Sequence, residues 1–201
     1  DPVCFVSNPA SGKMGYAIAK AAADSGAEVI LVSGPTALKI PFGVSRIDVV
    51  SAAEMANAVF DQMNDADIII KVAAVSDYKP SEKADHKIKK GEGGISVAME
   101  RTVDILAELG RRKKHQILVG FAAETKTLKE NAVEKLNRKN PEMITGNLVN
   151  DPSSGFNSDT NKINLFFKDG SIEELPMMDK DAVAHILLDR VESILKSRKN
   201  N

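Results

Sequence analysis

The sequence predicts an α/β fold: a Rossmann-like, mostly parallel sheet with helices on both faces and an antiparallel hairpin near the C-terminus. Short apolar runs alternate with amphipathic stretches of about 10 to 15 residues, which is the pattern of βαβ units. The run at residues 68–75 is short, apolar and β-branched, as buried parallel strands are. A Lys168-Asp169-Gly170 turn between two further short runs predicts the hairpin.

Composition bounds the possibilities. A chain of 201 residues without internal repeats predicts one domain, over residues 1–201. Its 27 basic and 28 acidic residues give a net charge of −1, which favours neither nucleic acid nor an anionic membrane as partner. No apolar run has the roughly 18 residues of a membrane span. The single cysteine, Cys4, excludes an internal disulfide and fits a reducing compartment, so we expect a cytoplasmic protein. The start at Asp1 without a Met suggests a fragment of a longer protein.

The first half alternates strands and helices. Ser51 and Glu54 form a capping-box pattern at the start of the second helix, and Ser25-Gly26 is typical of a helix end. In order, we expect a strand or extended segment at 3–7, a turn at 7–15, a helix at 16–24, strands at 28–33 and 46–50, a helix from Ser51, and a strand at 65–75.

The second half repeats the alternation and ends in the hairpin. The helix at 125–139 has Leu128, Ala132, Val133 and Leu136 on one face. In order, we expect an extended segment at 95–99, a helix from Thr102 or Asp104 through 109, strands at 116–122 and near 141–145, irregular chain at 146–161, the hairpin of 162–167 and 171–175, and a helix from Asp179 through about 196.

Residues 68–90 are the best candidate for a site. The small Ala73 and Ala74 lie near the carboxyl end of a predicted strand, where open α/β sheets bind ligands. Asp77 follows, and then a Gly-rich loop with Lys87, Lys89 and Lys90. This order predicts a site for an anionic nucleotide, in which the two alanines would form the floor, Asp77 would supply an acid and the three lysines would form a basic lid. An ordinary strand with a solvated basic loop is the alternative.

A second candidate is the turn before the first helix. Ser11-Gly12-Lys13 resembles the end of a P-loop, but Ser7 and Met14 stand where that motif needs Gly and Ser or Thr. A helix start can still bind phosphate, and a plain strand–helix turn remains the alternative. The three histidines lack zinc spacing and no acid–base pair stands out. Catalysis would therefore rest on positioning and charge neutralisation.

Eight blocks occur in order along essentially the whole chain: S-N-x-x-S-G-K-M-G-Y-A-I-A, L-V-S-G-P-T, A-A-V-S-D-Y-K-P, K-I-K-K, D-I-L-A-E-L-G, V-G-F-A-A-E-T, K-L-x-x-K and G-F-N-S-D-T-N. Together they resemble bacterial phosphopantothenoylcysteine synthetase, usually the C-terminal half of a bifunctional coenzyme A biosynthesis protein. The family's first strand and Gly-rich turn normally precede D-P-V. FMN would belong only to the decarboxylase domain expected before them.

The resemblance implies a two-step ligase reaction. 4′-Phosphopantothenate would attack the α-phosphate of CTP to give an acyl-cytidylate and pyrophosphate, with Mg²⁺ neutralising the triphosphate. The amine of L-cysteine would then displace CMP.

The resemblance also implies site residues. Asn8 would hold the acyl-cytidylate and Lys87 would stabilise charge on CTP. The metal ligands stay unassigned, and a solvated helix face is the alternative for the two helix lysines. The nucleotide would be bound by the backbone of Lys71, Val72 and Ala73, by Asp77, by the helix start at Val103, Asp104, Ile105 and Leu106, and by Phe121, Lys135 and Lys139.

The sequence departs from the family at four positions: Cys4 replaces a common Arg, Pro9 and Ala10 replace a polar pair, and Val103 replaces a common Pro. The sequence leaves two other functions as alternatives. An NAD(P)-dependent reductase would need a Gly fingerprint and a Tyr-x-x-x-Lys pair, which are missing from the sequence. A non-catalytic nucleotide-binding or assembly module is the other.

The resemblance also implies a dimer. The N-L-F-F strand, Asn164–Phe167, would expose an apolar edge. We therefore expect a homodimer through the 162–175 hairpin, with the 156–161 loop near the active site. A monomer whose hairpin folds back on its own sheet is the alternative.

Overall fold

The computed structural model describes residues 1–91, 93–148 and 158–199. Its main sheet has five strands in the order β10-β9-β7-β6-β3. The strands are β3 (Ile68–Lys71), β6 (Ile117–Glu124), β7 (Met143–Leu148), β9 (Asn164–Phe167) and β10 (Ile172–Glu174). β3, β6 and β7 are parallel, whereas β9 and β10 are antiparallel additions. The predicted fold class is confirmed.

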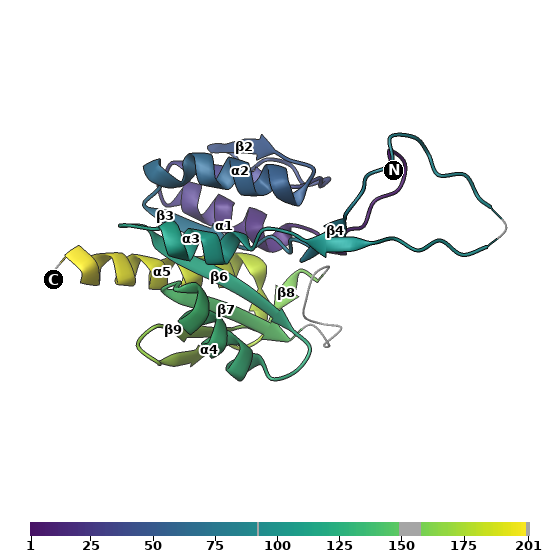
Figure 1. The fold of residues 1–201 in the computed structure, drawn as a ribbon. Helices are drawn as coiled ribbons and strands as arrows, with labels where there is room; N and C mark the ends of the chain where they lie inside the picture. The colour runs from purple at the N-terminus through teal and green to yellow at the C-terminus, as the bar shows by residue number, and fades with distance from the viewer. Residues whose placement is uncertain (92, 149–157, 200–201) are drawn as a thin grey trace.

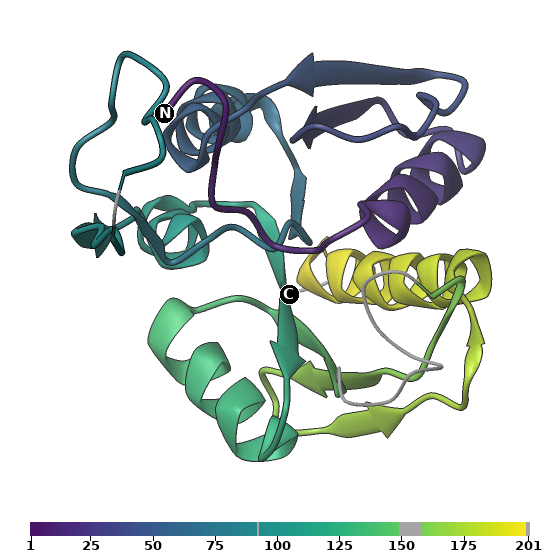
Figure 2. The ribbon, with the colours of Figure 1, turned by 90° about the vertical axis from the view of Figure 1, so that its right-hand side faces the viewer.

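Helices cover both faces of this sheet (Figures 1 and 2). Helices α1 (Lys13–Asp24) and α5 (Lys180–Lys199) lie side by side on one face. Helices α2 (Ala52–Gln62), α3 (Ile105–Arg112) and α4 (Leu128–Lys139) pack on the other. Successive residues of β6 alternate between the two cores, as side chains on a strand must. Ile117 and Val119 pack in the core between the sheet and helices α1 and α5, whereas Leu118 packs in the core between the sheet and helices α2, α3 and α4.

Three smaller strand pairs complete the described chain. Strands β1 (Val29–Ser33) and β2 (Val44–Asp48) form a separate parallel pair before α2. A 3₁₀ turn, η1 (Met63–Asp65), links α2 to β3, and β8 (Thr160–Asn161) pairs with β11 (Met178–Asp179). β4 (Tyr78–Pro80) and β5 (Met99–Arg101) pair at the base of a long loop. We call residues 78–91 and 93–101 the arm, because Figure 1 shows them projecting from the layered body.

The sequence motifs that predict helix starts form the expected hydrogen bonds. Ser51 accepts the N–H of Glu54 and the Glu54 carboxylate accepts the Ser51 N–H, so the predicted capping box is confirmed. Of the two predicted starts for α3, the structure has Asp104, whose carboxylate accepts the N–H of Ala107 at 3.1 Å. In the described residues, no helix combines the length and apolar character that crossing a membrane requires.

Several predicted boundaries are wrong. Of the two alternatives for residues 3–7, a strand or an extended segment, the strand is wrong, and of the extended segment predicted at 95–99 only Met99 is in a strand. β3 ends at Lys71 rather than Val75, because its ladder with β6 stops at the Lys71–Gly120 pair. α4 begins at Leu128, after Thr127 in a left-handed conformation at φ 51°.

The hairpin forms as predicted, but its first strand is not an edge. β9 pairs with β7 on one side and β10 on the other, and Leu165 and Phe166 are buried. The argument that Asn164–Phe167 exposes an apolar edge is therefore wrong. The hairpin extends the chain's own sheet, because these side chains fill its two cores.

Candidate functional site

A pocket of about 280 Å³ opens where the parallel strands β3 and β6 end. This is the edge of an α/β sheet at which ligands bind. Its wall comes from the exit of β3, the approach to α3, one side chain of β6 and one face of α4. The lining residues are Lys71, Val75, Ser76, Asp77, Thr102, Val103, Asp104, Ile105, Leu106, Phe121, Lys135, Arg138 and Lys139.

Hydrogen bonds fix the two loops that form the pocket's rim. The Thr102 hydroxyl donates to the Ser76 carbonyl at 2.6 Å, and the Thr102 N–H donates to the Asp77 carbonyl at 2.9 Å. The chain leaving β3 is thereby tied to the chain entering α3. Asp77 and the first turn of α3 consequently face the same space.

The N-terminal turn of α3 forms one wall. Asp104 caps this helix and also accepts Lys139 Nζ at 2.7 Å. Burial by itself would raise the pKa of Asp104, but the hydrogen bonds from Lys139 and from the Ala107 N–H hold that pKa below its usual value. Asp104 is thus a carboxylate that positions both the helix start and a lysine. The free N–H groups of a helix start are suited to binding phosphate oxygens.

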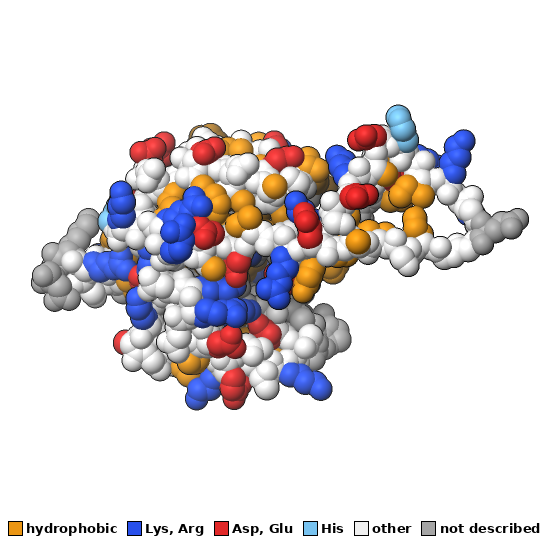
Figure 3. Space-filling view, in the orientation of Figure 1, with side chains coloured by type: hydrophobic (Ala, Val, Ile, Leu, Met, Phe, Trp, Pro, Cys, Tyr) orange, Lys and Arg blue, Asp and Glu red, His pale blue; other side chains and the backbone are white. Residues whose placement is uncertain are grey.

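Helix α4 contributes three cations within about one turn, on the face turned to the pocket: Lys135, Arg138 and Lys139. Lys135 Nζ contacts Glu124 at 2.6 Å, and Glu124 also accepts Asn131 Nδ2 at 2.8 Å. Arg138 pairs with Glu134 at 3.3 Å. Figure 3 shows basic side chains gathered over the region of α3 and α4, with acidic ones between them. The alternative that this is only a solvated helix face fails for Lys139, whose side chain is 13% exposed.

Lys71, the last residue of β3, contributes a cation from within the sheet. Its Nζ donates to the carbonyl of Ala73 at 2.7 Å. The pKa of Lys71 is lowered to about 8, mainly by burial and next by the nearby charge of Lys139, while Asp104 and Asp77 oppose the shift.

Nine of the thirteen predicted site residues line this pocket, and four do not: Asn8, Val72, Ala73 and Lys87. Val72 packs toward the α1–α5 core and Ala73 toward the opposite core. Asn8 lies close by, because its Nδ2 donates to the Ala74 carbonyl at 2.5 Å.

Lys87 is exposed on the arm, away from the pocket wall. The arm contacts the N-terminal segment, where the Ile88 N–H donates to the Asp1 carboxylate at 3.0 Å. The structure therefore does not bring Lys87 together with the other predicted residues. Cys4, Pro9 and Ala10, where the sequence departs from the family, lie on the same exposed N-terminal segment.

The 156–161 loop is described only from Ser158. Phe156 and Asn157, predicted to lie near the site, are outside the described residues. Asp159 contacts Lys13 at the start of α1 at 2.6 Å. Lys180 Nζ donates to the Ser158 carbonyl. The described end of the loop is thus held between the first turns of α1 and α5.

Sequence reasoning missed four of the lining residues: Val75, Ser76, Thr102 and Arg138. Arg138 had a usable signal, because it lies three residues after Lys135 and one before Lys139, on the same helix face. Thr102 had no such signal, because it contributes to the site through hydrogen bonds to a loop 26 residues away in sequence. Residues 1–91, 93–148 and 158–199 contain no cluster of three or more His, Cys, Asp or Glu that could hold a metal.

Comparison with known proteins gives consistent matches. The family model described as the DNA/pantothenate metabolism flavoprotein C-terminal domain matches residues 1–195. The coenzyme A biosynthesis bifunctional protein CoaBC of Bacillus subtilis is 49% identical over 197 residues, covering 98% of this chain and 48% of that protein. CoaBC of Escherichia coli (strain K12) is 45% identical over 95% of this chain. The chain spans about half the length of these curated relatives.

Solved structures agree on the fold. The crystal structure of the C-terminal domain of a CoaBC is 44% identical, with a TM-score of 0.84, over 98% of this chain and 89% of that one. A Cab2 H337A mutant in complex with phosphopantothenate-cysteine is 15% identical, with a TM-score of 0.77, over 98% of this chain and 83% of that one. At that identity the second likeness shows the fold alone.

Proposed function

This chain belongs to the DNA/pantothenate metabolism flavoprotein C-terminal domain family, and from that premise we propose that it is a phosphopantothenate–cysteine ligase driven by CTP. Its proposed substrates are 4′-phosphopantothenate, L-cysteine and CTP. The observation that carries the proposal is the basic pocket at the carboxyl ends of β3 and β6, where four basic side chains meet a helix N-terminus.

The reaction needs activation, because a carboxylate is a poor electrophile. In the first step a pantothenate carboxylate oxygen bonds to the α-phosphorus of CTP, and the bond to the β-phosphate oxygen breaks, releasing pyrophosphate. In the second step the cysteine amine attacks the acyl carbon of the cytidylate. CMP leaves with the bonding electrons, and the amine loses a proton as the amide forms.

The pocket residues would bind and stabilise charge rather than react. The start of α3 at Val103–Leu106 would hold phosphate oxygens, with Lys135 and Lys139 neutralising them. Asp77 would accept a hydrogen bond from the ribose or base. The backbone at Lys71–Ala73 and the ring of Phe121 would position the nucleotide.

Asn8 would hold the acyl-cytidylate, from its place beside the exit of β3. Lys87 would act on the triphosphate only after the arm brings it to the pocket, since it is exposed and does not line the wall.

The residues that line the pocket do not fit a resident Mg²⁺. Its two carboxylates are Asp77 and Asp104, and Asp104 is already engaged by Lys139 and by the cap of α3. Mg²⁺ prefers near-octahedral oxygen ligands and keeps several waters. We therefore treat it as part of the Mg–CTP substrate.

We also propose a homodimer, with the contact moved from the hairpin to the arm. The arm and the N-terminal segment beside it expose several apolar side chains: Val3 57%, Phe5 88%, Ile88 50%, Ile95 67% and Val97 55%. A patch of this kind typically marks an interface. Light scattering at low micromolar concentration tests the proposal, and a mass near 21.6 kDa would contradict it.

The deciding experiment for the function is a pyrophosphate-release assay. We expect release that requires both CTP and 4′-phosphopantothenate, and formation of the cysteine amide with CMP once L-cysteine is added. ATP should substitute poorly. Equal thermal stabilisation by CTP and ATP with Mg²⁺ would contradict the nucleotide preference, and no CTP-dependent release would contradict the ligase itself.

A further inference from the structure

Lys71 differs from the other cations of the pocket in its surroundings. Lys135, Arg138 and Lys139 each contact a carboxylate. Within the described ranges, Lys71 forms no ion pair, and its ammonium is held only by the carbonyl of Ala73. A largely buried ammonium with a neutral acceptor still lacks a counter-ion.

The fold directs this side chain into the pocket. Lys71 pairs with Gly120 in the parallel β3–β6 ladder, so the two residues present the same face of the sheet. A side chain at Gly120 would meet Leu106 and Ile144, which identifies this face as the one covered by α3 and α4. Lys71 therefore lies beneath the start of α3, among the groups proposed to hold phosphate.

We propose that the Lys71 ammonium is a direct ligand of a nucleotide phosphate oxygen, and that nucleotide binding draws a proton onto Lys71. The inference rests on the proposed function and adds to it a side-chain role and a proton. In the free protein a fraction of Lys71 is the neutral amine. The bound phosphate favours the ammonium, so one proton from solvent adds to the Nζ lone pair of that fraction.

The pH window follows from the groups that face Lys71. These are Asp77 at the exit of β3, Asp104 at the start of α3, and Lys135, Arg138 and Lys139 on α4. The pKa of Asp104 is held below its usual value, and a terminal phosphate loses its last proton at about pH 6. Because the pKa of Lys71 in the free protein is about 8, Mg–CTP affinity should fall as pH rises above 8.

Isothermal titration calorimetry with Mg–CTP, from about pH 7 to 9.5, tests both parts of the inference. Each pH is measured in two buffers of different ionisation enthalpy, which gives the number of protons taken up. For the original protein we expect uptake that rises above pH 7.5, and an affinity that falls by up to about tenfold per pH unit above 8. Lys71→Met should bind about ten- to a hundredfold more weakly at pH 7 and show less uptake. Lys71→Arg should retain affinity without linked uptake, because a guanidinium stays charged.

Two controls separate the causes. Lys129→Met removes an exposed lysine from the same helix as Lys135 and should change neither quantity. Inorganic triphosphate with Mg²⁺ tests whether phosphate is the group recognised, and Lys71→Met should weaken it as well. Weakening of CTP but not of triphosphate would overturn the phosphate assignment. Unchanged affinity or unchanged proton uptake in Lys71→Met would overturn the inference alone, whereas a failure of the original protein to bind CTP would overturn the proposed function.

Discussion

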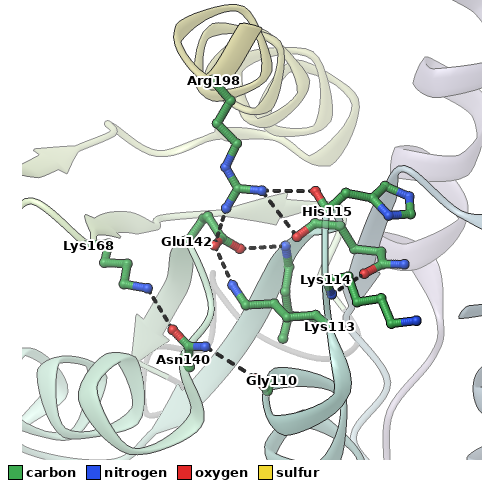
Figure 4. A network of polar contacts seen from close by, with 10 residues as sticks. Gly110, Lys113, Lys114, His115, Asn140, Glu142, Lys168 and Arg198 are labelled. Carbon is green, nitrogen blue, oxygen red and sulfur yellow. Dashed lines mark hydrogen bonds and ion pairs between the residues drawn. The ribbon is translucent and has the colours of Figure 1, made fainter. Parts of the chain in front are cut away.

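A buried charge is paired with opposite charges at one end of the central parallel strands, and is left without a counter-ion at the other. At the amino end, Glu142 is buried just before β7 and accepts hydrogen bonds from Lys113, Arg198 and the N–H of Leu118 (Figure 4). At the carboxyl end, Lys71 has only a carbonyl as its acceptor. Both groups are charged and mostly out of water, but only the first is matched by opposite charge.

The hydrogen bonds of Glu142 at the amino end also connect several elements of the fold. Figure 4 shows the Glu142 contacts joining the end of α3, the start of β6 and the end of α5, and Arg198 also donates to the His115 carbonyl at 3.0 Å. Nearby, Asn140 links Lys168 of the hairpin to the carbonyl of Gly110. A charge that is fully paired within the chain holds the fold together. A charge left without a counter-ion weakens the free fold and leaves affinity for an anion.

The largest expected effect is at the matched end. Glu142→Ala leaves the Lys113 ammonium, 8% exposed, without its carboxylate, so we expect a loss of about 3–5 kcal/mol in the free energy of unfolding. Urea unfolding measures it. The control is Glu134→Ala, which breaks the exposed pair with Arg138 and should change stability by less than about 0.5 kcal/mol. Similar small losses in both variants would contradict the comparison.

The second largest effect is expected where α3 and α4 pack closely together, beside the Glu142 contacts. A Cβ at Gly110 would lie 1.8 Å from the carbonyl oxygen of Lys139, a backbone atom that cannot rotate away. Gly110→Ala should therefore push the helices apart and destabilise the protein by about 3 kcal/mol. Thermal unfolding measures it, with Gly91→Ala as the control, since a Cβ there meets nothing within 4 Å. A Gly110→Ala protein as stable as the control would show that the helices yield freely.

The third predicted effect is a gain in the free energy of unfolding rather than a loss. Between pH 8 and 10.5 the unfolded chain keeps the Lys71 proton that the folded chain loses, so this residue makes stability rise with pH across that window. Below it the buried charge weakens the free protein. Lys71→Met removes the charge, and loss of the bond to Ala73 offsets part of the gain. We expect the variant to be more stable by about 2 kcal/mol at pH 7, with the difference shrinking toward pH 10.5.

Unfolding of both proteins at several pH values without nucleotide measures this difference. Comparing them at each pH removes the contributions of other lysines with lowered pKa values, such as Lys113 and Lys180. A variant less stable than the original protein at pH 7 would mean that the Lys71 contacts outweigh its desolvation.

Sequence reasoning succeeded where a signal is local and failed where it depends on a distant strand. The cap at Ser51 was readable, and Asp104 was one of two predicted helix starts, because donor and acceptor lie three residues apart. Residues 72–75 continue an apolar run, but the strand stops at Lys71 where its pairing with β6 ends. Likewise β9 looked like an exposed edge, since nothing in its own residues shows that β7 lies beside it.

The same limit applies to the pocket. Motif order identified the lining residues at the start of α3 and two of the three on α4, Lys135 and Lys139. The Thr102 contacts that join two loops cannot be read from spacing. Motif order also grouped Lys87 with residues that the structure places elsewhere, because the arm carries Lys87 away from the pocket wall.

The smallest expected effect on stability lies at neither end of the sheet. Lys87 is exposed on the arm, so Lys87→Gln should change the free energy of unfolding by less than about 0.5 kcal/mol. The same change should abolish pyrophosphate release, because in the proposed function the lysine would stabilise charge on the triphosphate once the arm reaches the pocket. Lys83→Gln, an exposed lysine earlier in the arm, is the matched control and should keep activity. Unchanged release by Lys87→Gln would refute its role. Lost release in both variants would mean that the arm's net charge matters rather than Lys87 itself.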